Sequence, residues 1–573
     1  MVDKGTVSAV LEEIAVLLEL LGENPFKVRA YQNAARAVTV MSGDLSEAID
    51  SGNLKNIKGI GEHITSKIIE LRQKGRLEYL DELKARVPPG LIEMLKIPGL
   101  GPKRIRHIHE ALNISTVGEL EYACRENRLM LLEGFGEKLQ KKVMSGIEAL
   151  NMYRGRHLWI EAFETAESIR ESLVKIPGVV SAVTGGSIRR RRETVKDIDI
   201  LSVVPENKRK TVSESVRKMP LVHEITGSGG TKISLVTKSG IACDIRMVES
   251  GEEPYALHHF TGSREHNTAM RSRAQRMGLK MNEYGLWRGD ELIKCASEEE
   301  LFSKLGLQFI PPELREDMGE IEAAEKDELP NLVENKHLKG VLHVHTTWSD
   351  GRNTIDEMAI EAKKLGFTYI GISDHSRSAA YAGGLGIEKL KEQITAARKA
   401  EDAAGIRVLV GTESDILPDG SLDFPAEVLE SLDFVIGSVH SSFGMSRNDM
   451  TARIVKALRN PRLSILGHPT GRLLLAREPY EIDMETVLKE SASNGVALEL
   501  NANPHRLDLD WRLCREAKKL GIKIAISPDA HVTDGLSDTY IGVGIARKGW
   551  LEPKDVLNAF PLEDLLRIIR KRT

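Results

Sequence analysis

The C-terminal part of the chain repeats one pattern, a short apolar run followed by a helical stretch, which restricts the possible folds more than any other feature. Seven such runs read as strands, and most are followed by a segment with helical periodicity. A helix after each strand lets the chain cross over to a parallel neighbour, so the pattern favours a barrel of parallel strands over an open sheet. The runs end near His345, His375, Glu413, His440, His468, Asn501 and Asp529.

Side chains that bind metals gather at the ends of these runs. The carboxyl ends of barrel strands meet on one face, so nine histidine, aspartate and glutamate side chains should converge there. His343 and His345 are two residues apart, and an extended strand would point both imidazoles the same way. The expected ligands are His343, His345, Asp350, His375, Glu413, His440, His468, Asp529 and His531.

Mixed imidazole and carboxylate ligands suit zinc, manganese or iron, and nine are too many for one ion. The set therefore predicts two or three ions. Clustered ions favour phosphoester hydrolysis, because they lower the pKa of bound water from 15.7 to about 7. Any one of these histidines alone is as readily a packed barrel residue, but nine together favour a metal centre, and only His337 and His505 fall outside the pattern.

The same segments resemble the polymerase and histidinol phosphatase (PHP) superfamily, through HVHTTWSDG, ISDH, GTES, SVHS, GHP and PDAH. The resemblance spans nearly all of 338–573. It implies a distorted (β/α)7 barrel with an active site of three metal ions, since every ligand position that the superfamily needs is filled.

The rest of the chain reads as several further domains, as expected for 573 residues. Short helices with glycine turns come first, and an α+β region follows. An acidic stretch with few large apolar side chains then predicts a solvated linker. The expected domains are 1–85, helical and binding DNA or its 5′-phosphate; 86–150, helix-hairpin-helix; 151–315, nucleotidyltransferase palm and nucleotide-selection region; 316–336, linker; and 337–573, phosphoesterase.

Composition excludes some classes of protein. No apolar run approaches the roughly 20 residues of a membrane span, and the N-terminus has no signal-peptide pattern. Four cysteines without paired spacing suit reduced thiols, so a cytoplasmic protein is expected. The net charge of −4 requires any nucleic-acid contact to come from local basic surfaces.

A second centre is predicted at GGSIRRRRETVKDIDI, which begins at Gly185. Strand alternation puts Asp197 and Asp199 on one face, and Asp244 in IACDIR could lie beside them on another strand. Three carboxylates suit two Mg²⁺ ions, or Mn²⁺, for nucleotidyl transfer. The turn formed by Gly185, Gly186, Ser187 and Arg190 is predicted to bind a triphosphate. The alternative for the four consecutive arginines is a solvated basic surface without a specific role.

The chain here resembles the family X DNA polymerases over roughly 1–315, most clearly in HHFTGSREHNTAMRSRAQRMGLKMNEYGLW from His258 to Trp287. The resemblance implies that Phe260 and Gly262 line the sugar pocket, Asn267 contacts the minor-groove edge of the nucleotide and Arg271 lies on the template side. His259 stands where vertebrate members usually carry tyrosine, which leaves discrimination between deoxyribose and ribose open.

Three glycine turns in the helical region, IKGIG, IPGLG and EGFGEK, resemble helix-hairpin-helix motifs. Glycine lets backbone amides at a helix start approach a DNA phosphate, which positions DNA without reading its sequence. One such turn is more often a plain helix connection, but three favour DNA binding. The glycines concerned are Gly59, Gly61, Gly99, Gly101, Gly134 and Gly136.

The first hairpin belongs, in family X enzymes, to a small domain that can hold a Schiff-base lysine, and Lys67 matches that lysine. His63 stands where relatives with lyase activity have lysine, so a plain surface role for Lys67 is equally open. Lys27 and Tyr31 are weaker candidates for DNA contacts.

The ligands themselves predict only phosphoester hydrolysis in the barrel. The two resemblances together imply a template-directed DNA polymerase that fills short gaps in repair, coupled to a manganese-dependent 3′ to 5′ exonuclease. Endonuclease action at baseless sites is equally compatible with the ligands. The partners expected are gapped or primer-template DNA and deoxynucleoside triphosphates, with the protein a monomer. The rivals are a phosphatase of a small metabolite with an inactive polymerase half, and a scaffold that binds DNA ends.

Overall fold

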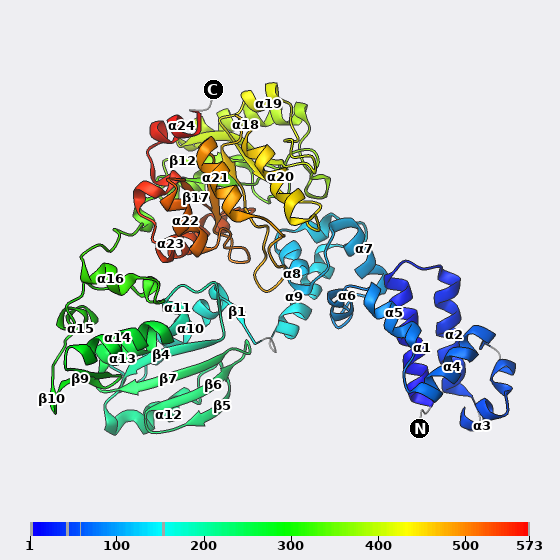
Figure 1. Cartoon of the computed structure of the whole chain (residues 1–573). Coiled ribbons are helices and arrows are strands. Elements are labelled where there is room, and N and C mark those ends of the chain that lie inside the picture. The colour runs from blue at the N-terminus through cyan, green and yellow to red at the C-terminus, as the bar shows by residue number, and fades with distance from the viewer. Residues whose placement is uncertain (1–3, 42–44, 58, 152–154, 571–573) are drawn as a thin grey trace. The chain divides into compact units, whose positions relative to one another are not determined.

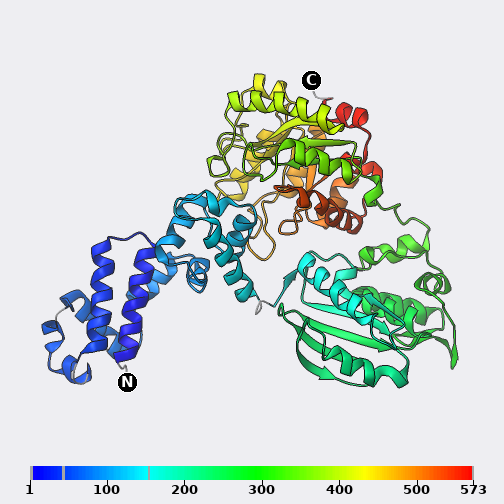
Figure 2. The same cartoon turned by 180° about the vertical axis from the view of Figure 1, so that it is seen from behind.

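The computed structural model describes residues 4–41, 45–57, 59–151 and 155–570, which form two compact units, Met1–Asn151 and Met152–Thr573. Each unit is shown in Figures 1 and 2. Within the described residues, no helix is both long and apolar enough to cross a membrane. The multidomain architecture predicted from the sequence is confirmed: a helical region, an α+β region and a barrel.

The first unit is entirely helical in the part that the structure describes. Asn24 caps α2 by accepting a hydrogen bond from the amide of Phe26, and Pro25 occupies the first turn, where no amide donor is needed. Apolar stripes such as Leu11, Ile14 and Leu18 of α1 form the core. The helices are α1 (Lys4–Leu20), α2 (Pro25–Val40), α3 (Leu45–Asp50), α4 (Glu62–Lys74), α5 (Glu78–Arg86), α6 (Pro89–Met94), α7 (Pro102–Leu112), α8 (Val117–Arg125) and α9 (Glu137–Asn151).

The second unit begins with a five-stranded sheet of order β2-β4-β7-β6-β5. Helices α10 and α12 pack on the face formed by Ile198 and Ile200, and α13 packs on the opposite face beside Leu201 and Val203. The elements are β1 (His157–Leu158), α10 (Trp159–Leu173), β2 (Ser181–Thr184), α11 (Gly186–Arg189), β3 (Thr194–Val195), β4 (Asp197–Val203), α12 (Arg209–Val216), β5 (Val222–Ser228), β6 (Lys232–Thr237) and β7 (Ala242–Val248).

A small helical subdomain with a three-stranded sheet of order β10-β9-β8 follows. Tyr255, Met270 and Phe302 lie in its core. The elements are α13 (Glu253–Thr261), α14 (Arg264–Arg276), β8 (Lys280–Asn282), β9 (Gly285–Arg288), β10 (Glu291–Leu292), α15 (Glu298–Lys304) and α16 (Glu320–Glu325).

The expectation of a solvated linker at 316–336 is wrong at Glu316 and on one side of α16, while much of the segment, Asp327 and Glu328 included, is exposed. Glu320 and Ile321 of α16 are buried, and Glu320 forms an ion pair of 2.6 Å with buried His266. Glu316 is also partnered, by Arg190 and Lys548. Two of the acidic residues that suggested solvation, Glu316 and Glu320, are instead paired with basic groups far away in the sequence.

The C-terminal barrel has seven parallel strands in chain order, as predicted, and a bridge between Val344 and Ala530 links its first strand to the segment after the last. Helices lie outside the strands (Figure 1). The strands are β11 (Gly340–Val344), β12 (Tyr369–Ile372), β13 (Arg407–Asp415), β14 (Phe434–Ser438), β15 (Ile465–Leu466), β16 (Ala497–Asn501) and β17 (Ile524–Ser527). The helices are α17 (Ile355–Lys364), α18 (Ile387–Ala404), α19 (Ala426–Glu430), α20 (Arg447–Leu458), α21 (Met484–Asn494), α22 (Trp511–Lys519), α23 (Thr539–Lys548) and α24 (Leu562–Arg570).

Candidate metal centre and polymerase centre

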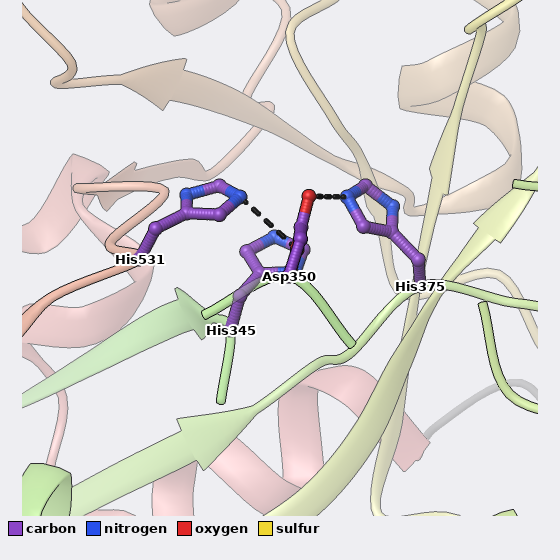
Figure 3. Close-up of side chains that lie close together, drawn as sticks. All are labelled: His345, Asp350, His375 and His531. Atoms are coloured by element: carbon purple, nitrogen blue, oxygen red, sulfur yellow. Dashed lines mark ion pairs between the residues drawn. The ribbon is translucent and has the colours of Figure 1, made fainter. Parts of the chain in front are cut away.

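The nine side chains predicted as metal ligands lie together at the carboxyl ends of the barrel strands. The ligand atoms of eight of them form three overlapping groups, in each of which the atoms lie within 4.8 Å of one another, and the ninth residue, His468, lies 2.9 Å from Glu413. Figure 3 shows the first group, in which three imidazoles surround one carboxylate. The groups are His345, Asp350, His375 and His531; His343, His345 and Asp529; and His375, Glu413 and His440.

Glu413 and Asp350 are the carboxylates at the centre of the site. Glu413 lies 2.9 Å from His375 Nδ1, 2.9 Å from His468 Nε2 and 3.3 Å from His440 Nε2. Asp350 lies 3.5 Å from His375 Nε2 and 3.4 Å from His531 Nε2 (Figure 3). At this spacing, the imidazole nitrogens and carboxylate oxygens point toward the same positions, as the ligands of a shared metal ion must.

Three of these residues have a backbone that residues other than glycine rarely adopt. The φ angle is +63° at His343, +24° at His468 and +52° at Asp529. Such strain persists where the surrounding structure enforces it, and it concentrates at functional sites. The expectation of a regular extended strand at His343 is therefore wrong. A register shift between Val341 and Val344 places the ring of His343 5.2 Å from that of His345.

Carboxylates outside the predicted set orient the histidines. Glu499 on β16 accepts from His343 Nδ1 at 2.5 Å and from the backbone amide of His468 at 2.7 Å. Asp415 lies 2.5 Å from His440 Nδ1. A carboxylate behind a histidine fixes which ring nitrogen faces the metal and raises its basicity. The signal that could have revealed Glu499 is a lone carboxylate in the otherwise apolar run VALELN.

The loop that carries Asp350 is held by the buried carboxylate of Asp374. This group accepts from the amide and the hydroxyl of Thr346, both at 2.7 Å, and from the hydroxyl of Ser349 at 2.5 Å. Gln393 donates to it as well. Asp374 immediately precedes His375. Its hydrogen bonds therefore join the loop that carries Asp350 to the strand end that carries His375.

The donor set fits metal ions. Nε2 of His343 and both ring nitrogens of His345 are buried and have no hydrogen-bond partner among the residues that the structure describes. Burial, together with His531 and His375, lowers the pKa of His345 to about 4, so its ring is neutral and able to bind a metal at pH 7. Burial raises the pKa of Glu413, but neighbouring histidines, with His440 and His343 foremost, outweigh burial and hold it well below its usual value.

The three carboxylates of the second predicted centre lie on adjacent strands. β4 and β7 are parallel with Asp199 opposite Asp244, and alternation puts Asp197 on the same face. Burial, then the charges of Asp197 and Asp244, raise the pKa of Asp199 to about 6. Asp244 contacts Lys232 Nζ and Ser234 Oγ, each at 2.6 Å. Three crowded carboxylates in this arrangement suit divalent ions with oxygen ligands.

The glycine turn before α11 lies against these carboxylates. The amide of Gly185 donates to the carbonyl oxygen of Asp199 at 2.8 Å. Gly186 has a φ of +58°, and a Cβ atom there would lie 2.2 Å from Asp199 Oδ2. Only glycine permits this approach, so the turn and the carboxylate are fitted to each other. Ser187 follows within α11.

None of the four consecutive arginines forms a simple solvated edge. Arg189 donates to Glu298 and Thr261, and Arg190 donates to Glu316 and to the carbonyl oxygen of Thr261. The other two arginines are also engaged: Arg191 stacks on the ring of Trp159, and Arg192 lies 3.8 Å from Glu316. The basic run therefore ties the sheet to the segments that follow it, and Arg190 stays beside the glycine turn.

The residues expected to select the nucleotide surround the end of α13. Arg246 lies over the ring of Phe260, and a Cβ atom at Gly262 would come within 2.5 Å of Asn267 Oδ1. Asn267 Nδ2 donates to the carbonyl oxygen of His259 at 2.7 Å, so this amide already stabilises the turn. Arg271, on α14, is exposed.

Each predicted hairpin of the first unit has the same geometry. Its first glycine has a left-handed backbone: φ is +105° at Gly59, +95° at Gly99 and +80° at Gly134. The second glycine directly precedes a helix, and a Cβ atom there would contact none of the described residues within 4 Å. Packing inside the protein therefore does not explain glycine at these second positions. A glycine there lets a phosphate approach the backbone amide at the helix start closely. The second glycines are Gly61, Gly101 and Gly136.

Lys67, Lys27 and Tyr31 gather around Tyr79, which the sequence did not single out. Lys67 Nζ lies 3.8 Å from the centre of the Tyr79 ring, and Tyr31 stacks on that ring at 6.3 Å. Burial first, and also the charge of Lys27, lower the pKa of Lys67. His63 is exposed on the same helix.

The fold and the two sets of ligands define a chain with a nucleotidyltransferase-type centre and a separate metal-dependent phosphoesterase barrel. Family models match at four places: the helix-hairpin-helix domain at 4–77, the SAM-like helix-hairpin-helix tandem at 91–149, the DNA polymerase beta thumb at 256–316 and the PHP domain at 341–503.

Curated relatives match either the whole chain or its barrel. The DNA polymerase/3′-5′ exonuclease PolX of Bacillus subtilis is 38% identical over 577 aligned residues, covering 99% of both chains. A probable phosphatase of Thermoanaerobacter sp. is 33% identical and covers 34% of this chain and 81% of its own. A probable phosphatase of Syntrophotalea carbinolica is 25% identical and covers 38% of this chain. The chain belongs to the family X DNA polymerases that carry a C-terminal PHP domain.

Proposed function

We propose that the protein is a template-directed DNA polymerase whose PHP domain is a 3′ to 5′ exonuclease. The proposal is supported by the presence on one chain of both the clustered barrel residues and three carboxylates on adjacent sheet strands, and by the match to a polymerase/exonuclease relative over 99% of both chains. A phosphatase would need only the barrel ligands, and a scaffold that binds DNA ends would need neither set of ligands.

At the polymerase centre, Asp197, Asp199 and Asp244 would hold Mg²⁺, which neutralises charge on the phosphates when bound. The glycine turn lies against the same carboxylates, because Gly186 packs directly on Asp199, so the turn is placed to approach the triphosphate. Lys232 and Ser234 fix the orientation of the Asp244 carboxylate. Asp244 is then the candidate for accepting the proton of the primer hydroxyl.

At the PHP centre, the nine barrel ligands would hold two or three Mn²⁺, Zn²⁺ or iron ions, which supply hydroxide at neutral pH when bound. Glu499 and Asp415 hold His343 and His440 so that Nε2 of each ring faces inward. His468 and Asp529, both with strained backbones, lie at the same centre: His468 Nε2 is 2.9 Å from Glu413, and Asp529 Oδ1 is 3.5 Å from His343 Nε2. The chain therefore presents a prearranged ligand shell to a phosphodiester.

The first unit suits a role in gap repair. Three open hairpin amides would hold phosphates without reading sequence, which favours gapped DNA of any sequence. We assign Lys67 as a candidate nucleophile toward a baseless sugar, because burial lowers its pKa and so leaves more of the amine unprotonated than in a solvated lysine. Cleavage at baseless sites by the PHP domain is a further proposed activity.

A second candidate for the barrel is a phosphatase of small phosphomonoesters, because relatives named as probable phosphatases match this domain. The two candidates differ in substrate, so one pair of assays separates them. An exonuclease shortens a labelled strand, whereas a phosphatase releases inorganic phosphate from a small phosphomonoester.

The test is a gel assay on gapped DNA with a 5′-labelled primer, with Mg²⁺ or Mn²⁺, with and without nucleotides. We expect lengthening when all four nucleotides and template are present, and stepwise shortening from the 3′ end with Mn²⁺ alone. An unchanged primer in every condition, with phosphate released from a small ester, would replace the proposal with the phosphatase.

A further inference from the structure

The last turn of α23 in the barrel reaches the arginine-rich turn of the polymerase centre. Lys548 is completely buried, although lysine rarely loses all its water without partners. Its ammonium group donates to Glu316 Oε1 at 2.6 Å and to the carbonyl oxygens of Arg190 at 3.1 Å and Glu313 at 3.2 Å. The ammonium group therefore contacts three polar atoms, all of which belong to the polymerase half or to the segment directly after it.

Glu316 connects Lys548 to the side chain of Arg190. Arg190 Nε donates to the same carboxylate oxygen at 3.0 Å, and its Nη1 donates to the carbonyl oxygen of Thr261 at 2.7 Å. The Glu316 side chain is only 11% exposed, so water screens these charges weakly. One carboxylate thus bridges a cation of the barrel and a cation of the polymerase turn.

Arg190 adjoins the residues that would bind the nucleotide. It directly follows α11, a four-residue helix that begins at Gly186 against Asp199. Lys548 therefore holds both the backbone and, through Glu316, the side chain of the residue at the end of the turn.

A separate contact at the next residue keeps α23 on this turn. Arg191 has a φ of +55°, and its guanidinium lies 4.3 Å from the centre of the Trp159 ring and 5.9 Å from that of Tyr540. A Cβ atom at Gly544 would come within 2.9 Å of the Arg191 side chain. Helix α23 therefore contacts the turn at two successive residues, Arg190 and Arg191.

We propose that Lys548, a residue of the PHP domain, is a positioning residue for nucleotide binding at the polymerase centre and acts through Glu316 and Arg190. The inference rests on the proposed function, because it requires a triphosphate at α11. Without Lys548, the carbonyl oxygen of Arg190 loses its buried donor and the turn loses an anchor. The KM for the nucleotide should rise about tenfold, within the usual range for coupled sites, with little change in kcat.

The experiment measures single-nucleotide gap filling by the full-length protein. Lys548→Met keeps the length of the side chain and removes its charge, while Lys548→Arg keeps the charge. Lys554→Met is the matched control, because that lysine of the same domain has a side chain 71% exposed. We expect the tenfold rise in KM for Lys548→Met, partial recovery with arginine, no change for Lys554→Met, and wild-type exonuclease rates throughout.

An unchanged KM in Lys548→Met with normal exonuclease activity would overturn the inference. If that variant loses both activities, Glu316→Gln decides, because it removes the shared carboxylate charge from the polymerase side. A normal KM in Glu316→Gln would then overturn the inference, and a raised KM would support it. A wild-type protein that does not extend a primer at all would instead overturn the proposed function.

Discussion

Replacing Gly186 with alanine tests the polymerase centre at its tightest contact. The new Cβ atom would lie 2.2 Å from Asp199 Oδ2, whereas contacts of this kind are essentially never shorter than 3.0 Å. The turn or the carboxylate must therefore move by about 1 Å, and a misplacement of that size costs about 100-fold in rate. The left-handed backbone at φ +58° adds about 1–2 kcal/mol of strain. We expect primer extension to fall about 100-fold.

Two measurements separate the clash from the backbone strain. Gly278 also has a left-handed backbone, at φ +71°, but a Cβ atom there would meet no atom within 4 Å in the described part of the chain. Gly278→Ala should therefore lose a similar amount of stability and keep its extension rate. Exonuclease activity, measured in the same preparations, should be normal in both variants. Extension by Gly186→Ala within threefold of wild type, or an equal loss in Gly278→Ala, would refute the reasoning.

Four further predictions follow from single contacts. Glu499→Gln should lower exonuclease activity about 10- to 100-fold at limiting Mn²⁺ and spare extension; an unchanged Mn²⁺ dependence would contradict this. The Mg²⁺ concentration needed for extension should rise as the pH falls through about 6, because protons then compete for Asp199, whose pKa is raised; titrations at pH 5.5 and 7.5 check this. Lys67→Ala should abolish borohydride trapping on baseless DNA, and trapping equal to wild type would exclude this lysine as the nucleophile. Gly101→Val should leave the melting temperature nearly unchanged, since a Cβ atom there contacts no described residue within 4 Å, but it should weaken binding to gapped DNA in fluorescence anisotropy. Undiminished affinity would show that this hairpin does not contact DNA.

The barrel could be predicted because its strands are regular and its polar residues follow the strand ends. His440 and His468, for example, each come two residues after a strand, and this spacing alone places them on one face. The paired carboxylates Asp197 and Asp199 were equally readable, because strand alternation is a local property.

Other features depend on partners that are distant in the sequence. The left-handed backbone of His343 follows from a bulge between neighbouring strands, and no local pattern specifies it. Glu316 and Glu320 looked solvated because their partners, Lys548 and His266, lie 232 and 54 residues away. Glu499 was missed because its role consists of orienting His343, which only the assembled barrel brings next to it.

The most direct test of the account compares Asp244→Ala and His343→Ala on the same labelled, gapped DNA. Asp244 belongs only to the polymerase centre and His343 only to the PHP centre. We expect Asp244→Ala to lose extension and keep 3′ to 5′ shortening, and His343→Ala to do the reverse. Loss of both activities in either properly folded variant would contradict two independent centres.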